Sequence, residues 1–161
     1  MRRRLTVFGF MTATAILRPP GAPSAEQDVA ATIVNSGSTN RPGFRIVVNR
    51  SGVAEFTSAP REFVAQPNQS TPILRTLPRS LVEALFSDLE AAKPLDSLPP
   101  VHCAKSVSLG TTLIVVFGEK QTPDLSCGDG GNPVMRNLIR DTDQIVALIR
   151  TDVSAPESGV K

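Results

Sequence analysis

The sequence predicts an α+β fold: an antiparallel sheet of about four to five strands with two helices packed on one of its faces, in the order ββαββα. Two pairs of short apolar segments flank turns that contain glycine, and two longer segments repeat apolar residues at helical spacing. The 14 prolines and 11 glycines separate these short elements. Because 161 residues suit one hydrophobic core, we expect a single domain, at 43–151.

The first predicted hairpin joins residues 44–49 to residues 53–57 through a turn at 50–52. Residues 31–34 are a candidate short edge strand. They lie inside the polar, glycine-punctuated range 25–42, which otherwise predicts a flexible linker. The face of the hairpin that we expect to be buried carries Phe44, Ile46 and Val48.

The first predicted helix begins between Pro78 and Ser80. Proline suits a first helical position, and Ser80 with Glu83 has the spacing of a capping box, so two start signals compete. Pro94 ends the helix. Its apolar stripe consists of Leu81, Val82, Leu85, Phe86 and Leu89.

The second hairpin combines a dense apolar run at 113–117, predicted as the central strand, with an edge strand at 121–125. Pro123 confines the second segment to an edge. Asn132 and Pro133 then predict the start of a last helix, 134–150. The tail, 152–161, is expected to be disordered.

The first 24 residues have the pattern of a signal peptide. Arg2, Arg3 and Arg4 precede a short apolar run that is too brief for a stable membrane span, and small residues surround Ser24. A disordered basic tail is the alternative. Removing this leader, which holds four basic and no acidic residues, changes the formal charge from +2 to −2. We therefore expect a secreted or periplasmic protein without a stable membrane span in its mature chain.

Cys103 and Cys127 are the two cysteines, an even number that favours one disulfide in an oxidising compartment. Two free buried thiols are the alternative. With His102, the single histidine, they match no zinc spacing, so we expect no metal and no cofactor. The absence of Trp and Tyr removes the usual base-stacking platforms, which argues against nucleic acid as a partner.

Two segments partly resemble trypsin-type serine proteases: 101–103 around His102, and 127–133. The resemblance fails where the nucleophilic serine should stand, because Gly130 follows Asp129 directly. No catalytic residue is therefore predicted. An alternative hypothesis is a small hydrolase that uses His102 with Asp124 or Asp129.

The glycine-rich loop before the last helix is the candidate binding loop. A calcium site there would lack the ligand spacing of an EF-hand, and an anion site would rest on one glycine-rich turn. The simplest interpretation is a loop that leads into a helix cap. The residues of this candidate loop are Ser126, Gly128, Asp129, Gly130, Gly131 and Asn132.

The layout of residues 43–150 is similar to that of small exported bacterial proteins of unknown function. The segments that carry the resemblance are 44–56, 81–98 and 122–127. It implies a bacterial envelope setting and no known activity. Our leading hypothesis is a noncatalytic exported domain that binds another macromolecule through the uncovered sheet face or the candidate loop.

Overall fold

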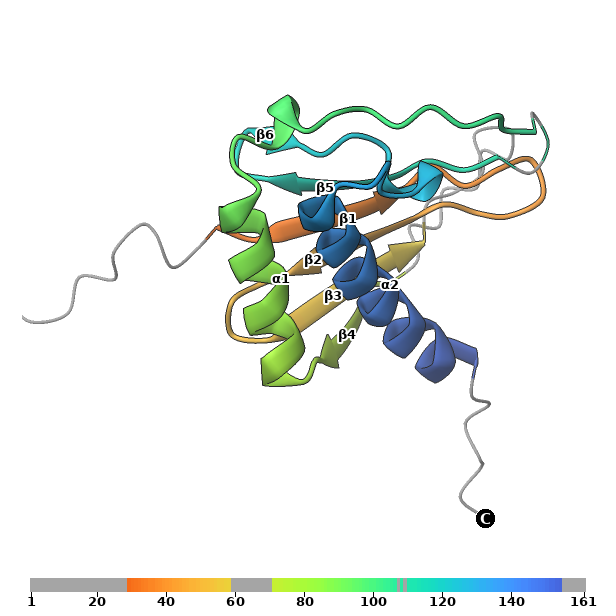
Figure 1. Ribbon diagram of the computed structural model, residues 1–161. Helices are drawn as coiled ribbons and strands as arrows, with labels where there is room; N and C mark the ends of the chain where they lie inside the picture. Colours follow the sequence, from red (N-terminus) through yellow and green to blue (C-terminus); the bar gives the residue numbers. More distant parts are fainter. Residues whose placement is uncertain (1–28, 59–70, 107, 109, 155–161) are drawn as a thin grey trace, which may run out of the picture.

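The computed structural model describes residues 29–58, 71–106, 108 and 110–154, and these form an α+β fold (Figure 1). One antiparallel sheet has the strand order β4-β3-β2-β1-β5-β6. The six strands exceed the four to five that were predicted, and the described order is ββββαββα rather than ββαββα. Their bounds are β1 Ala31–Asn35, β2 Phe44–Val48, β3 Val53–Ser58, β4 Ile73–Thr76, β5 Leu113–Phe117 and β6 Lys120–Gln121.

Strand β1 lies inside the range predicted as a linker, and it is an interior strand. It pairs with β2 on one side and β5 on the other, so its prediction as an edge strand is wrong. Ala31 and Ile33 are fully buried. In the sequence, the polar segments on either side make β1 look like part of a linker. In the fold, its backbone groups form hydrogen bonds with the two neighbouring strands.

The predicted β2–β3 turn is confirmed. Gly52 adopts a φ of 92°, which favours glycine, and its N–H donates to the carbonyl of Asn49. Strand β4 then pairs with β3 and adds the edge strand that the sequence did not predict. Its four residues alternate between half-buried and exposed, a pattern too short to be distinguished from a loop.

Helices α1 (Arg79–Ala91) and α2 (Pro133–Ser154) lie on the same face of the sheet (Figure 1). Leu81, Leu85 and Leu89 of α1 are buried, which confirms the predicted stripe. From α2, Leu138, Ile145 and Ile149 enter the core. The sheet contributes residues of one parity to this core, namely Ala31, Ile33, Phe44, Ile46, Val48, Ala54, Leu113, Val115 and Phe117.

Helix α1 begins at Arg79, inside the predicted window, but neither of the two predicted start signals operates there. Pro78 occupies the cap position, before the helix, and no side chain caps the helix there. The capping box between Ser80 and Glu83 does not form, because Glu83 accepts a 2.7 Å hydrogen bond from Arg79 instead. An (i, i+4) ion pair on an exposed helix surface therefore takes the carboxylate that the box would have used.

The start of α2 agrees with the prediction. The Asn132 side chain accepts hydrogen bonds from the backbone N–H groups of Val134 and Met135, at 2.9 and 3.3 Å. The helix continues to Ser154, beyond the predicted end at residue 150. The remainder of the predicted tail and the predicted leader, 1–24, lie outside the described residues.

In the second hairpin, β6 spans two residues and pairs only with Val116 and Phe117. The predicted strand 121–125 is therefore mostly wrong. The Thr122 hydroxyl accepts a hydrogen bond from the Val115 N–H at 3.0 Å, and a 3-10 helix, η3 (Leu125–Cys127), follows. A second 3-10 helix, η2 (Leu95–Ser97), comes after α1.

Candidate functional site

The strongest candidate site is a cavity of about 390 Å³ between α2, η3 and one end of the sheet, which we call the η3 cavity. Apolar side chains of the sheet and of α2 line part of it, and hydroxyl, amide, carboxyl and guanidinium groups line the rest. Its volume is at the small end of the range for small-molecule sites. The lining residues are Asn35, Phe44, Thr111, Leu113, Leu125, Ser126, Gly128, Ile139, Asp143, Val146 and Arg150.

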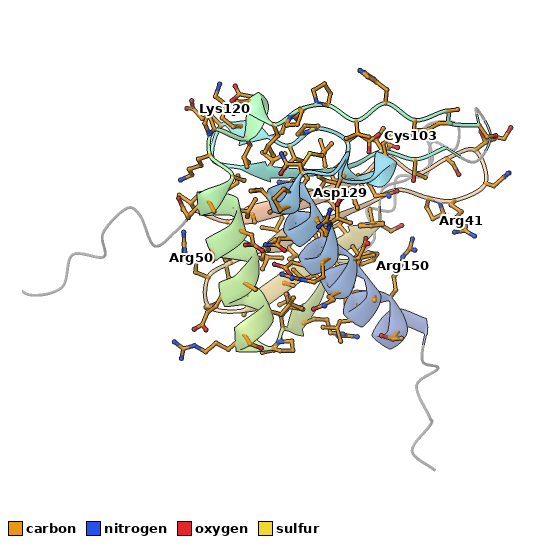
Figure 2. The ribbon with its side chains drawn as sticks, viewed as in Figure 1. Arg41, Arg50, Cys103, Lys120, Asp129 and Arg150 are labelled. Atoms are coloured by element: carbon orange, nitrogen blue, oxygen red, sulfur yellow. A yellow bond between two sulfur atoms is a disulfide. The ribbon has the colours of Figure 1, made fainter. Side chains whose placement is uncertain are left out.

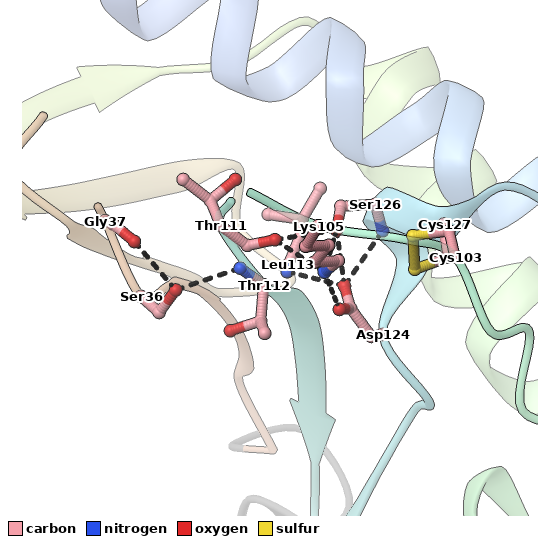
Figure 3. A network of polar contacts seen from close by, with 10 residues as sticks. All are labelled: Ser36, Gly37, Cys103, Lys105, Thr111, Thr112, Leu113, Asp124, Ser126 and Cys127. Atoms are coloured by element: carbon pink, nitrogen blue, oxygen red, sulfur yellow. Dashed lines mark hydrogen bonds and ion pairs between the residues drawn. A yellow bond between two sulfur atoms is a disulfide. The ribbon is translucent and has the colours of Figure 1, made fainter. Parts of the chain in front are cut away.

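A polar network holds η3 beside this cavity (Figure 3). The Lys105 ammonium donates to the Ser126 hydroxyl at 2.7 Å, to the Thr111 carbonyl at 2.6 Å, and to the Asp124 carboxylate. The other oxygen of Asp124 accepts from the Leu113 and Ser126 backbone N–H groups, each at 3.0 Å. One carboxylate thus joins the start of β5, the η3 turn and the segment that carries Lys105.

The charge of Asp124 is stabilised by this network. Partial burial acts to raise the pKa of its carboxyl, but hydrogen bonds from Lys105, Leu113 and Ser126 together lower that pKa below its ordinary value. Asp124 is therefore ionised at neutral pH and forms an ion pair with Lys105.

The disulfide predicted from the sequence is present between Cys103 and Cys127, whose Cα atoms are 5.3 Å apart (Figures 2 and 3). Cys127 is the last residue of η3, and Cys103 lies two residues before Lys105. The disulfide and the Lys105 contacts therefore attach the same irregular segment to the same turn.

The candidate binding loop divides into parts with different roles. Ser126 and Gly128 line the η3 cavity. Asp129 instead accepts from Arg136 at 2.5 Å and from the Gly131 N–H at 3.0 Å, and these two contacts lower the pKa of its carboxyl. A side chain at Gly130 would collide with Val101, since a Cβ atom there would lie 2.8 Å from a Val101 methyl carbon. Asn132 is committed to the α2 cap.

The histidine is not joined to the carboxylates that the hydrolase hypothesis requires. His102 is exposed, and among the described residues no hydrogen bond links it to Asp124 or Asp129. Both carboxylates form ion pairs with other residues. Within the described ranges, no three His, Cys, Asp or Glu side chains gather in a way that could hold a metal ion.

A second cavity, of about 400 Å³, lies beside Phe117. Four of its five charged side chains already have partners, and Glu119 is the exception among the described residues. Glu90 pairs with both Arg50 and Lys93, and Lys120 pairs with Asp96, outside the lining. We favour the η3 cavity, where Arg150, labelled in Figure 2, forms no ion pair with any described residue. Its guanidinium carbon lies 5.2 Å from the centroid of the Phe44 ring.

Several residues of the η3 cavity were not predicted from the sequence. Asp143 is exposed, as expected for a polar residue of an amphipathic helix, but it also lines the cavity, and partial desolvation raises the pKa of its carboxyl. Arg150 follows it by two helical turns on the same side. The two residues are seven positions apart, and Arg150 follows the buried Ile149. This spacing is the sequence pattern that could have indicated that they share one side of the helix. Lys105 has no comparable local signal.

A carboxyl pair between the helices was also missed. Asp88 of α1 is half-buried and lies beside the buried Asp141 of α2. Arg140 donates to Asp141 at 2.9 Å and lies 3.5 Å from Asp88. Burial and the neighbouring Asp141 raise the pKa of the Asp88 carboxyl, and the nearby guanidinium only partly offsets this.

Replacing Asp88 by asparagine is expected to stabilise the fold at neutral pH, by about 1 kcal/mol. The amide donates to the second oxygen of Asp141, which has no hydrogen-bond partner, and removes a like charge. A raised folded-state pKa means that the protonated form stabilises the fold below the unfolded pKa, and that this contribution is lost as the pH rises through the folded pKa.

The difference in free energy of unfolding between D88N and the parent should therefore be near zero at about pH 3 and grow toward pH 7. Urea unfolding at both values measures it. Asp96→Asn is the control, because the ion pair with Lys120 lowers the pKa of Asp96 and gives the opposite pH trend. An Asp88→Asn effect that is equal at the two pH values would contradict the expected protonation.

No protein-family model matches this chain, and no curated protein matches it. Within the part of the chain that the structure describes, no helix combines the length and apolar character needed to cross a membrane.

Proposed function

We propose that this chain is an exported, noncatalytic domain that binds a protein partner through the sheet face opposite the helices. The disulfide between Cys103 and Cys127 is compatible with export into an oxidising compartment. The leader pattern at 1–24 supports the same setting. Recovery of the full-length chain from the cytosol with both thiols titratable would overturn this part of the proposal.

The observation that carries the proposal is the composition of that open face. The strand register places side chains of the parity opposite to the core on it, and both described helices lie on the other side (Figure 1). Most of them are β-branched or apolar, and Leu74 is 61% exposed. The residues of this open face are Thr32, Val34, Arg45, Val47, Val53, Glu55, Thr57, Leu74, Thr76, Ile114 and Val116.

Two opposite charges define what the partner must present. Arg45 and Glu55 are exposed on neighbouring strands, and neither forms an ion pair with any described residue. Glu55 lies directly opposite Val47, and Arg45 lies in the adjacent cross-strand row, opposite Thr57. We therefore infer a largely apolar partner surface that presents an acidic group for Arg45 and, close to it, a basic group for Glu55.

The size of the open face favours a transient partner over a second copy of this chain. Strands about 4.8 Å apart with a rise of about 3.3 Å per residue give it an area on the order of 400 Å². A stable interface hides about 800 Å² on each partner. A face-to-face dimer through this surface alone would therefore be weak.

The test begins with chemical crosslinking of the untagged mature protein in the envelope fraction of the cells that produce it. The crosslinked protein is identified and purified, and its affinity is measured for the parent and for two variants, Leu74→Ser and Arg45→Glu. Each should weaken binding by about tenfold or more, because one removes apolar contact and the other reverses a complementary charge.

Two matched controls lie on the helices. Leu148→Ser removes another exposed leucine, and Arg79→Glu reverses another exposed charge. Both should bind like the parent. Equal loss in the controls, no crosslinked partner, or a concentration-dependent dimer that Leu74→Ser abolishes would each overturn the proposed protein partner.

A further inference from the structure

Two side chains of opposite charge line the η3 cavity and form no ion pair with each other. Arg150 and Asp143 both line it, and no described residue forms an ion pair with either. They are seven residues apart on α2, which corresponds to about 10 Å along the helix axis. The cavity therefore presents a cation at one end and a carboxyl group at the other.

The surface between these two ends is largely apolar. Phe44 and Leu113 of the sheet and Val146 of α2 contribute to it. Along the wall formed by η3, Ser126 presents a hydroxyl that Lys105 and Asp124 hold in place (Figure 3). The Asn35 side-chain carbonyl is occupied by the Gly37 N–H, while its amide nitrogen donates to no described residue. Polar backbone groups of a ligand would thus find partners beside apolar contacts.

We propose that the η3 cavity binds a short apolar peptide of two or three residues in its zwitterionic form, with the ammonium end at Asp143 and the carboxylate end at Arg150. An extended tripeptide spans about 10 Å, which is comparable to the axial spacing of the two residues along α2. The guanidinium is held over the Phe44 ring, where it can receive a carboxylate in a planar, two-contact geometry. This proposal is independent of the open sheet face, because no residue is shared between the two surfaces.

The probe is the tripeptide Ala-Leu-Ala, titrated into the oxidised full chain and followed by calorimetry and by amide chemical shifts. Arg150→Gln should weaken binding about tenfold or more, since a hydrogen bond to a charged group is lost. Asp143→Asn should weaken it as well. Arg79→Gln, an exposed arginine on α1, should bind like the parent.

Modified peptides assign each end. The C-terminal amide should lose affinity for the parent but show no further loss with Arg150→Gln, because both changes remove the same contact. The N-acetyl peptide should show the same relation with Asp143→Asn. Hexanoate tests whether a carboxylate with an apolar chain is sufficient.

Three results would overturn the proposal. The first is no binding of Ala-Leu-Ala at millimolar concentration to a chain whose spectrum shows that it is folded. The second is binding that Arg79→Gln weakens as much as Arg150→Gln does. The third is hexanoate binding as tightly as the peptide, with no dependence on Asp143, which would instead define a site for simple carboxylates.

Discussion

Reduction of the disulfide between Cys103 and Cys127 is expected to lower the melting temperature by about 10 °C. In the chain-entropy model, closing a loop with a sequence separation of 24 residues stabilises the fold by about 3 kcal/mol. For a domain of this size, each kcal/mol corresponds to about 3 °C. The loss should be large here because residues 98–106 have no helix or strand of their own.

Thermal unfolding with and without a phosphine reductant measures this effect. The double variant Cys103→Ser/Cys127→Ser should melt near the temperature of the reduced parent and should not respond to reductant. A parent midpoint that is unchanged by reduction would show that the Lys105 network holds the segment without the disulfide.

Asp124→Ala is expected to lower the free energy of unfolding by about 2–3 kcal/mol. The substitution removes the acceptor for the Leu113 and Ser126 N–H groups and leaves the Lys105 ammonium without its carboxylate. The Asp124 side chain is 24% exposed, so water replaces these contacts only in part. Urea unfolding at pH 7 measures the loss.

Asp124→Asn separates the hydrogen bonds from the charge. The amide oxygen still accepts from the two backbone groups, so this variant should lose less stability than Asp124→Ala. Because folding lowers the pKa of Asp124, its charge contributes stability above the unfolded pKa, and the contribution is lost as the pH falls through the folded pKa. The gap between parent and Asp124→Asn should therefore close under acidic conditions. A gap that is constant with pH would contradict the ionic role.

The helices and the strands with a clear apolar pattern were predictable, whereas the interior position of β1 and the presence of β4 were not. The apolar stripe of α1 and the Asn132 cap of α2 follow from local rules that operate within one or two turns. Strand β1, by contrast, is held by pairing with β2 and β5, and β5 is more than 70 residues away in the sequence. Local pattern cannot indicate a partner at that distance.

The same limit applies to the candidate site. Ser126 and Gly128 were found because they belong to a recognisable loop, whereas Lys105 meets Asp124 across 19 residues. The half-buried position of Asp88 could not be predicted, because an acidic residue on a helix usually faces water. Its environment depends on Asp141, which only the packing of α2 against α1 brings into contact.

The way β5 ends the sheet also bears on how this protein avoids aggregation. Strand β6 covers only Val116 and Phe117, which would leave the N–H groups of Leu113 and Val115 available to a foreign strand. The side chains of Asp124 and Thr122 occupy those two donors. On this side of the sheet, an intruding polypeptide therefore finds neither of these two donors free for pairing.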